Sequence, residues 1–306
     1  MFIPVEEAII KFKLMKKVIL TFVGIISLQF LSCSQKPTIA ELQKFAAVEK
    51  YPNDNYLDTV SHKKAIVVVA HDDDDCAMSG TLAKLKADGW EIKQLCFVVH
   101  HKNSELNSNP NYKEEELIVA DGVYRLGLDT IKYPYVPITR EEMEKQYLRE
   151  KITTELISKI NSYSPDVIFT LDNEMGGYGH PDHIYCSQLV LDLFNSKKIN
   201  VNRIYQSVYT NHMEKEIVDI WLYNKMKKYN FPNPTRLARE LYKIDGMPEP
   251  NVQINITNYA ETKMSYLLSF EEEARKSLRK FIPYFEEFDA KTYFTVFDRE
   301  FFRIIK

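Results

Sequence analysis

The sequence is poor in cysteine and glycine and has no excess of positive charge. Its 306 residues include 40 lysines and arginines against 43 aspartates and glutamates, so the formal net charge is −3. Nothing in this balance points to nucleic acid as a partner. Beyond the N-terminal segment, no uncharged run reaches the length of about 18 residues that a membrane-spanning helix needs. The apolar fraction of 45% is ordinary for a globular protein, and the length suits one large domain or two small ones.

Cysteine is too scarce and too irregularly spaced to build a disulfide framework. Only four cysteines are present, and Cys33 directly follows the N-terminal apolar segment. The other three, Cys76, Cys96 and Cys186, are an odd number with no paired spacing. We therefore expect no network of disulfides, even in an exported protein.

The N-terminus has the layout of a secretory signal. Met15-Lys16-Lys17 is a short positive region, residues 18–30 are uncharged and mostly apolar, and Leu31-Ser32-Cys33-Ser34 follows. This ending resembles the lipobox of bacterial lipoproteins, although Phe30 stands where that pattern prefers leucine. The resemblance implies lipidation of Cys33 and an exported protein anchored in a membrane of the cell envelope, in the periplasm or at the outer membrane. A plain signal peptide and an uncleaved anchor are the alternatives, and the true start could be Met15.

From residue 63 onward the pattern alternates between strand and helix. Residues 65–70, 91–99, 166–171 and 203–210 read as strands, and residues 77–88, 113–126, 139–163 and 181–195 read as helices. Strands that alternate with helices predict an α/β fold with a mostly parallel sheet flanked by helices on both faces. In such sheets, ligands bind beyond the carboxyl ends of the strands.

The rest of the chain is less regular. Residues 214–250 could form a lid over the site, residues from 258 onward read as helix, and residues 292–305 read as a possible edge strand. The expected organisation is a signal at residues 1–33, a polar tether at 34–61 and a single catalytic domain at 62–306. Within this domain, the core spans residues 63–212 and a lid or helical part spans residues 213–306.

Two clusters of histidine and aspartate follow predicted buried strands. His71-Asp72-Asp73-Asp74-Asp75 comes after the first strand, and Gly176-Gly177-Tyr178-Gly179-His180-Pro181-Asp182-His183 comes after the third. Each cluster alone has an ordinary explanation, as a solvated acidic turn or as surface histidines. Together, at one edge of a sheet, they predict a metal site in which His71, Asp74 and His183 supply two imidazoles and a carboxylate, a donor set typical of zinc.

Hydrolysis at such a site needs a base and hydrogen-bond donors as well as a metal. Asp73, next to the proposed ligand Asp74, is the natural base for the attacking water. His180 and Tyr178 are the available donors for developing negative charge. Three of the nine glycines lie in the loop before His180, so this loop bends sharply or approaches a ligand closely.

The two motifs resemble the signature of the PIG-L or LmbE-like family of N-acetylglucosaminyl-phosphatidylinositol deacetylases. The family's first motif, Ala-His-Pro-Asp-Asp-Glu, corresponds to Ala70-His71-Asp72-Asp73-Asp74-Asp75, and its second, His-Pro-Asp-His, is intact here as His180-Pro181-Asp182-His183. The resemblance covers residues 63–212. It implies a Rossmann-like fold, zinc or another divalent metal on His71, Asp74 and His183, Asp73 as base, help from His180 with the oxyanion or leaving group, and carbonyl polarisation by Tyr178.

The resemblance also implies a reaction: removal of an N-acetyl group from an amino sugar, with an N-acetylated amino sugar or glycoconjugate as the partner. Asp72 replaces the family's proline and Asp75 its glutamate, which leaves open whether catalysis is impaired. A non-catalytic carbohydrate-binding lipoprotein on the same scaffold is therefore one alternative. A metal-dependent phosphoesterase, which uses similar ligands, is another.

Overall fold

The computed structural model describes residues 36–98, 113–116, 136–228 and 233–306. The chain divides into two compact units, Met1–Thr38 and Ile39–Lys306. Of the first unit only residues 36–38 are described, and they form no helix or strand. The expected signal segment and Cys33 lie outside the described residues. In the part of the chain that the structure describes, no helix is both long and apolar enough to span a membrane.

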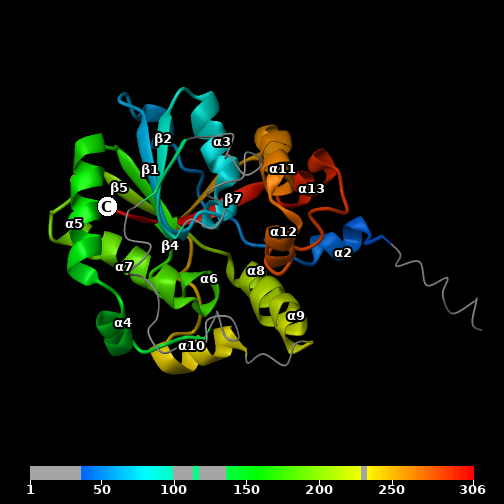
Figure 1. Ribbon diagram of the computed structural model, residues 1–306. Coiled ribbons are helices and arrows are strands. Elements are labelled where there is room, and N and C mark those ends of the chain that lie inside the picture. Colours follow the sequence, from blue (N-terminus) through cyan, green and yellow to red (C-terminus); the bar gives the residue numbers. More distant parts are fainter. Residues whose placement is uncertain (1–35, 99–112, 117–135, 229–232) are drawn as a thin grey trace, which may run out of the picture. The chain divides into compact units, whose positions relative to one another are not determined.

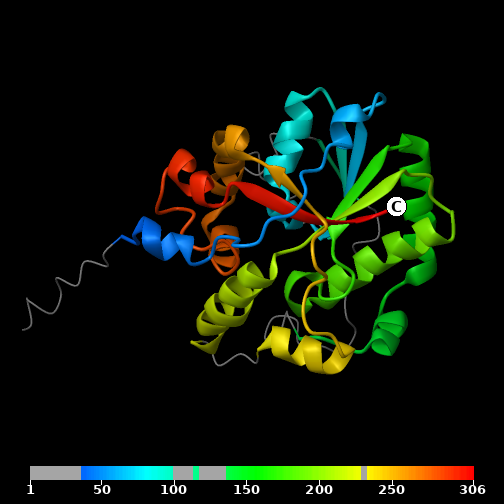
Figure 2. The same cartoon turned by 180° about the vertical axis from the view of Figure 1, so that it is seen from behind.

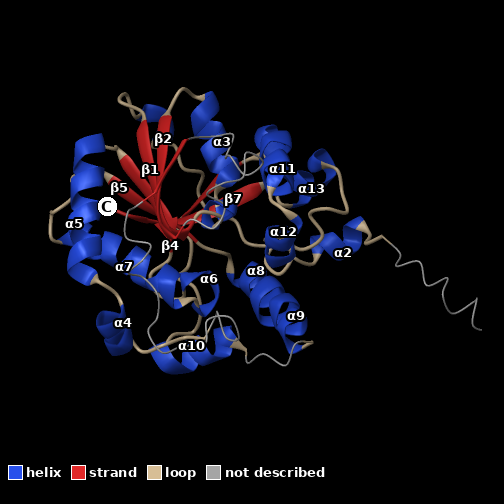
Figure 3. Ribbon diagram, in the orientation of Figure 1, coloured by secondary structure: helices blue, strands red, loops and turns tan. Residues whose placement is uncertain are grey.

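The second unit is built on a seven-stranded sheet of order β3-β2-β1-β4-β5-β7-β6 (Figure 3). The first five strands in this order pair in parallel, β7 pairs antiparallel with β5, and β6 pairs antiparallel with β7. The sheet is thus mostly parallel, and the expected Rossmann-like α/β class is confirmed. The strands are β1 (Lys64–His71), β2 (Glu91–Val98), β3 (Lys113–Glu116), β4 (Val167–Leu171), β5 (Arg203–Ser207), β6 (Val252–Asn255) and β7 (Arg299–Ile305).

Helices cover both faces of the sheet, as Figure 1 shows, with α5 and α7 on one side and α3 on the other. The central strand β1 explains why: Ile66 and Val68 pack in one cluster with residues of α5 and α7, and Val67 and Val69 pack in another with Leu82 of α3. Successive side chains of a strand point to opposite faces, so a continuous apolar run needs a cover on each. These helices are α3 (Ser79–Ala87), α5 (Arg149–Tyr163) and α7 (Pro181–Asn195).

Two expected helices differ from the structure. Residues 113–116 form strand β3 rather than the start of a helix, because they pair in parallel with β2, and residues 117–126 lie outside the described residues. The helix expected at 139–163 is broken into α4 (Arg140–Gln146) and α5. Tyr147 at the break has an extended backbone, its ring stacks on Tyr185, and its hydroxyl donates to Asp182. These contacts with α7 outweigh the local preference for helix.

The C-terminal region contains more regular structure than expected. It contains α8 (Asn211–Met213), a π-helical segment η5 (Glu214–Leu222), α9 (Tyr223–Lys227), α10 (Pro234–Tyr242), the 3-10 helix η6 (Thr257–Tyr259), α11 (Ala260–Ser269), α12 (Glu272–Leu278) and α13 (Ala290–Val296), besides β6 and β7. The edge strand expected at 292–305 is confirmed only in part. Helix α13 takes the first part of this range, and residues 299–305 do form a strand, β7, but it lies between β5 and β6 and not at the edge of the sheet.

The expected tether was also wrong beyond residue 38. Residues 39–61 contain α2 (Ile39–Gln43) and the short 3-10 helix η1 (Leu57–Thr59), and both pack into the second unit. Leu42 is fully buried in a cluster with Phe285 and Phe294, and Leu57 is buried against the sheet. Figure 2, seen from behind, shows α2 beside α13. A few apolar residues in a polar segment are enough to fix it to the core.

Candidate metal centre

The first motif folds into a tight turn at the carboxyl end of β1. His71 is the last residue of that strand, and the 3-10 helix η2 (Asp74–Ala77) begins three residues later. The Asp74 carboxylate accepts hydrogen bonds from the backbone N–H groups of Ala70 at 3.1 Å and His71 at 2.8 Å. These bonds turn Asp74 back toward the strand, so its side chain faces His71.

The second motif approaches from the neighbouring strand β4, through the glycine-rich loop. Buried Asp172, directly after β4, accepts hydrogen bonds from the backbone N–H groups of Glu174, Met175 and Gly177. Gly176 has φ +57°, and a Cβ there would lie 2.8 Å from Cβ of His183. This glycine is therefore required for the loop to pack tightly against the start of α7. The loop forms α6 (Gly176–Gly179).

Helix α7 carries both motif histidines at its N-terminus. His180 is the N-cap residue, and its Nδ1 accepts a hydrogen bond from the backbone N–H of Asp182 at 3.2 Å. Pro181 occupies the first helical position, where its missing N–H is not needed. His183 lies in the first turn and is buried. Because β1 and β4 are paired, this helix start lies beside the turn that holds Asp74.

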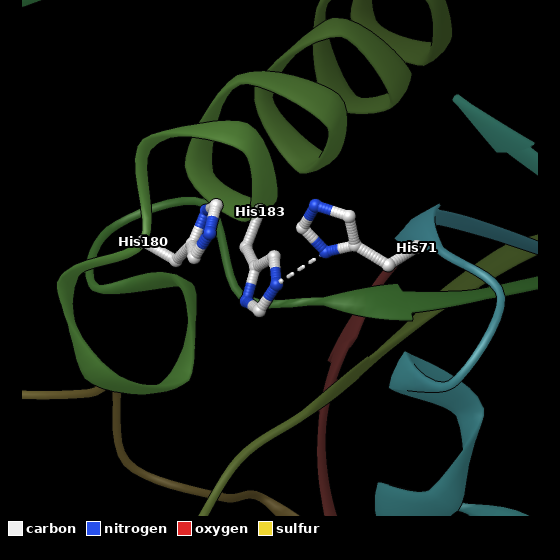
Figure 4. A group of neighbouring side chains, drawn as sticks. All are labelled: His71, His180 and His183. Carbon is white, nitrogen blue, oxygen red and sulfur yellow. Dashed lines mark hydrogen bonds between the residues drawn. The ribbon is translucent and has the colours of Figure 1, made fainter. Parts of the chain in front are cut away.

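The structure brings the three expected ligands together. His71 Nδ1 lies 3.1 Å from His183 Nε2, the contact that the dashed line in Figure 4 marks. His183 Nε2 lies 3.0 Å from one Asp74 carboxylate oxygen, and His71 Nδ1 lies 3.5 Å from the other. Donor atoms about 2.0–2.2 Å from a tetrahedral zinc ion are roughly 3.4 Å apart. The spacing of these three groups therefore fits a single small metal ion.

Hydrogen bonds on the far side of each ring decide which nitrogens face the centre. His183 Nδ1 lies 2.9 Å from the carbonyl oxygen of Gly176, and His71 Nε2 lies 3.3 Å from a carboxylate oxygen of Asp182. Both neighbours only accept, so each ring carries its proton there. Two lone pairs and the Asp74 carboxylate then face one another, and such groups repel unless a cation lies between them.

The protonation equilibria reflect the same crowding of negative charge. Burial lowers the pKa of His71, but the charge of Asp74 and the hydrogen bond to Asp182 outweigh it, so the pKa lies well above its usual value. Burial raises the pKa of Asp74, but the neighbouring imidazoles His183 and His71 hold it well below its usual value. The centre therefore attracts positive charge, and a proton and a metal ion compete for the same lone pairs.

The other three expected site residues lie around this triad. Asp73 has a carboxylate oxygen within 4.8 Å of the ligand atoms of His71 and Asp74. The His180 ring stacks on His183 with centroids 4.4 Å apart, and the Tyr178 ring meets His183 edge-on at 5.3 Å.

His71, His180 and His183 form a second set of possible ligands within 4.8 Å. The triad with Asp74 is tighter, and Nδ1 of His180 is already engaged by its cap bond.

Sequence reasoning missed several residues that shape the site. Asp182, inside the second motif, accepts from His71 on one oxygen and from the Tyr147 hydroxyl on the other. Asp172 was not singled out either, although an aspartate directly after a buried strand and before clustered glycines was a usable signal. Asp75, which departs from the family pattern, is fully buried and accepts a 2.6 Å hydrogen bond from the Tyr266 hydroxyl of α11.

The triad opens into a cavity of about 640 Å³. Asp73, His180 and Tyr178 line it together with His71, Asp74 and His183. All six residues expected to bind metal or act in catalysis therefore border one space. Its volume lies within the range of about 300–1,000 Å³ usual for small-molecule sites.

Fold and site together define a Rossmann-like α/β protein with a histidine and aspartate cluster, able to hold a metal ion, at the carboxyl edge of its sheet. The family model PIG-L, described as GlcNAc-PI de-N-acetylase, matches residues 66–194. This stretch runs from β1 to the end of α7 and includes both motifs. Residues 66–194 of the chain are thus a PIG-L family domain.

Several solved structures resemble this chain at low identity. GalB, the 4-carboxy-2-hydroxymuconate hydratase from Pseudomonas putida KT2440, is 11% identical with a TM-score of 0.45, over 80% of this chain and 96% of that one. N,N'-diacetylchitobiose deacetylase from Pyrococcus horikoshii is 17% identical with a TM-score of 0.36, over 79% and 84%. A deacetylase from the biosynthesis pathway of teicoplanin is 12% identical with a TM-score of 0.47, over 79% and 98%.

Proposed function

We propose that this chain is a metal-dependent N-deacetylase that removes an acetyl group from an N-acetylated amino sugar or glycoconjugate. The observation that carries the proposal is the convergence of His71, Asp74 and His183, whose lone pairs face one another across 3.0–3.5 Å. The PIG-L family domain supports the choice of reaction, because the matched family is described as a de-N-acetylase.

The residues present fit zinc. His71 Nδ1, His183 Nε2 and the Asp74 carboxylate would hold the ion, and two imidazoles with one carboxylate are a zinc donor set. When bound, such an ion supplies Lewis acidity, which polarises the acyl carbonyl and makes water more acidic. The second nitrogen of each imidazole is fixed by Gly176 or Asp182, which keeps the ligand lone pairs aimed at the centre.

The chain's other residues would move the protons. Asp73 accepts the proton of the attacking water, since Asp74 beside it is held by two backbone N–H groups. His180 accepts its cap bond at Nδ1, so its ring proton is on Nε2, where it can be donated to the departing amine. The Tyr178 hydroxyl donates to the carbonyl oxygen. Water's oxygen ends in acetate, and the amine leaves with the proton.

The test is acetate release by the purified full-length chain loaded with zinc, on a panel of N-acetylated amino sugars. We expect release by the wild type, a loss of at least 100-fold in Asp73→Asn, and unchanged metal content in that variant by elemental analysis. Sugar binding without any release would favour the non-catalytic alternative. Release of phosphate from phosphate esters instead would favour the phosphoesterase.

We also propose that the chain is an exported lipoprotein anchored through Cys33. The support is the sequence alone, a positive region, an apolar run and a cysteine after a small residue. Mass spectrometry of the protein from cell membranes should show a lipid-modified N-terminal cysteine. An unprocessed chain, or processing that Cys33→Ala leaves unchanged, would contradict the anchor.

A further inference from the structure

One surface of the second unit combines exposed apolar side chains with lysines. Its main part is a helical run, residues 211–228, which contains α8, η5 and α9. The inner side of this run is buried, and Met213, Ile217 and Val218 line the metal-centre cavity. The outer side leaves Ile220 42% and Tyr223 36% exposed. Single exposed apolar residues are common, so their neighbours decide whether they mark a binding surface.

The segment after α2 extends this surface. The rings of Phe45 and Trp221 meet edge-on with centroids 5.3 Å apart, and the backbone N–H of His212 donates to a Glu49 carboxylate oxygen at 2.8 Å. Val48, between these two contacts, is 69% exposed, more than any other large apolar side chain among the described residues. Figure 1 shows α2 and α9 on the same side of the second unit. Apolar groups from two distant parts of the sequence therefore share one surface.

The same surface is positively charged. Residues 211–228 contain four lysines, Lys215, Lys225, Lys227 and Lys228, and three acidic residues. Two of the acidic residues, Glu214 and Asp219, pair with Arg239 at 2.6 and 2.8 Å. Only Glu216 is then left to oppose the lysines of this run. Positive charge in excess of its local counter-charges attracts an anionic partner.

Trp221 lies where the apolar and the basic groups meet. The Nζ atom of Lys225 is 4.2 Å from the centroid of the Trp221 ring, and the indole N–H donates to the carbonyl oxygen of Arg279 at 2.9 Å. Burial and two neighbouring cations lower the pKa of Lys225, which shows how closely positive charges are grouped here. A half-buried tryptophan beside lysines is typical of surfaces at the boundary between lipid headgroups and acyl chains.

The start of the second unit indicates which anionic partner lies nearby. Its first residue, Ile39, follows Cys33 by only six residues. Six residues span at most roughly 22 Å when fully extended. A lipid on Cys33 would therefore hold the start of α2 within that distance of a bilayer. Phe45, just after α2, contacts Trp221, so the surface described above lies beside the point of attachment.

We propose that this surface, called here the membrane-facing surface and made of Val48, Trp221, Ile220, Tyr223 and the four lysines of residues 211–228, lies against a bilayer that contains anionic lipids. The proposal rests on the proposed anchor and deepens it, because it assigns the side of the protein that the anchor holds against the membrane. The apolar side chains would enter the headgroup layer, and the lysines would bind lipid phosphates. Each lysine near such a surface should strengthen the contact about fivefold.

The two tryptophans of the chain supply a probe for this contact. Trp221 belongs to the membrane-facing surface, whereas Trp90 is buried in the core beside the sheet. The full-length Trp90→Phe protein, which keeps Trp221, is reconstituted in vesicles of phosphatidylcholine and phosphatidylglycerol with or without brominated acyl chains. Because interfacial side chains lie about 5–10 Å into the headgroup and acyl boundary, bromine should reduce the emission of Trp221 at least about 1.5-fold.

The full-length Trp221→Phe protein is the matched control, since only Trp90 reports in it. Its emission should not change with bromine, and equal quenching in the two proteins would overturn the proposal. If Trp90→Phe does not fold, the difference in quenching between the wild type and Trp221→Phe measures the same contact.

Charge reversal tests the basic part of the surface. Lys227→Glu with Lys228→Glu, in the Trp90→Phe protein, should abolish most of the quenching. Lys197 and Lys198 are also adjacent and exposed, but they follow α7, so the same double change there should leave the quenching intact. An equal loss in both double variants would contradict the assignment of this surface.

The anchor and the surface fail in different ways. Sedimentation with vesicles but no quenching of Trp221 would overturn the surface and leave the anchor in place. If mass spectrometry finds Cys33 unmodified, the anchor fails, and quenching of Trp221 at excess vesicles still decides the surface. Dimerisation that Ile220→Asp abolishes, together with no quenching, would assign the surface to a second copy of the chain and overturn the proposal. None of these results depends on acetate release.

Discussion

Replacing Asp182 should weaken metal binding although Asp182 is not a proposed ligand. Its carboxylate lies 3.3 Å from His71 Nε2, on the side of the ring that faces away from His183. In Asp182→Ala this ring loses its acceptor, and its proton becomes free to move to Nδ1, the atom that would bind the metal. The metal-binding tautomer is then no longer favoured, and the ring is free to rotate.

These contacts set bounds on the expected loss of metal affinity. Removing the hydrogen-bond partner of a metal-bound histidine usually costs 10- to 100-fold in metal affinity, about 1.4–2.7 kcal/mol. Asp182→Asn should reduce the zinc affinity less than Asp182→Ala does. Its single amide oxygen can accept from His71 or from the Tyr147 hydroxyl, but the carboxylate accepts from both.

Zinc affinity at neutral pH, measured by competition with a chromophoric chelator, is the assay, with circular dichroism to confirm the fold. Tyr147→Phe is the matched control, because it removes only the hydroxyl on the other carboxylate oxygen. We expect it to change the affinity by less than about threefold, since the bond to His71 remains. A folded Asp182→Ala protein with zinc affinity within twofold of the wild type would refute the tautomer argument.

Other predictions concern the loop and a buried carboxylate. Asp172→Ala leaves several backbone N–H groups without their acceptor, so urea unfolding should show a loss of about 3 kcal/mol. Gly176→Ala should lower zinc affinity at least tenfold, because its Cβ would meet the Cβ of His183 at 2.8 Å. At Gly177 an added Cβ would have no atom within 4 Å. Gly177→Ala should therefore cost only about 1–3 kcal/mol of stability, because an alanine is strained at the positive φ of this position. Burial raises the pKa of Glu214 despite its hydrogen bond to an arginine, so the folded state binds the proton more tightly than the unfolded state. The resulting stability, fully present below the ordinary glutamate pKa of 4.5, should be lost as pH rises through the raised pKa. Glu214→Gln should remove this pH dependence from the free energy of unfolding, measured by denaturant unfolding at several pH values.

The part of the fold that sequence patterns predicted is the part set by local apolar periodicity. The β-branched run before His71 predicted a strand covered on both faces, and Pro181 after a histidine predicted the start of a helix. Two such elements at one edge of a parallel sheet bring their ends together. The triad was therefore predictable without any knowledge of side-chain geometry.

What could not be predicted depends on contacts between distant residues. Lys113–Glu116 reads as helix, yet it forms β3 because an open edge of β2 lies beside it. Strand β6, Val252–Asn255, was missed because four residues give too short a pattern, and only its pairing with β7 makes it a strand. The role of Asp182 was hidden for a related reason, since the sequence does not show which imidazole nitrogen meets which acceptor.

The C-terminal region does more than cover the site. Glu300 of β7 accepts hydrogen bonds from the backbone N–H groups of Gly80 at 2.9 Å and Thr81 at 2.7 Å, in the first turn of α3. Met78, the N-cap residue of α3, makes no side-chain capping hydrogen bond. Glu300, which is distant in the sequence, therefore accepts the capping hydrogen bonds at this helix start. Helix α3 directly follows the turn that carries Asp74, and Tyr266 binds Asp75 in that turn. The turn that carries the proposed ligand Asp74 thus depends on β7, and shortening that strand should disturb this turn as well as the sheet.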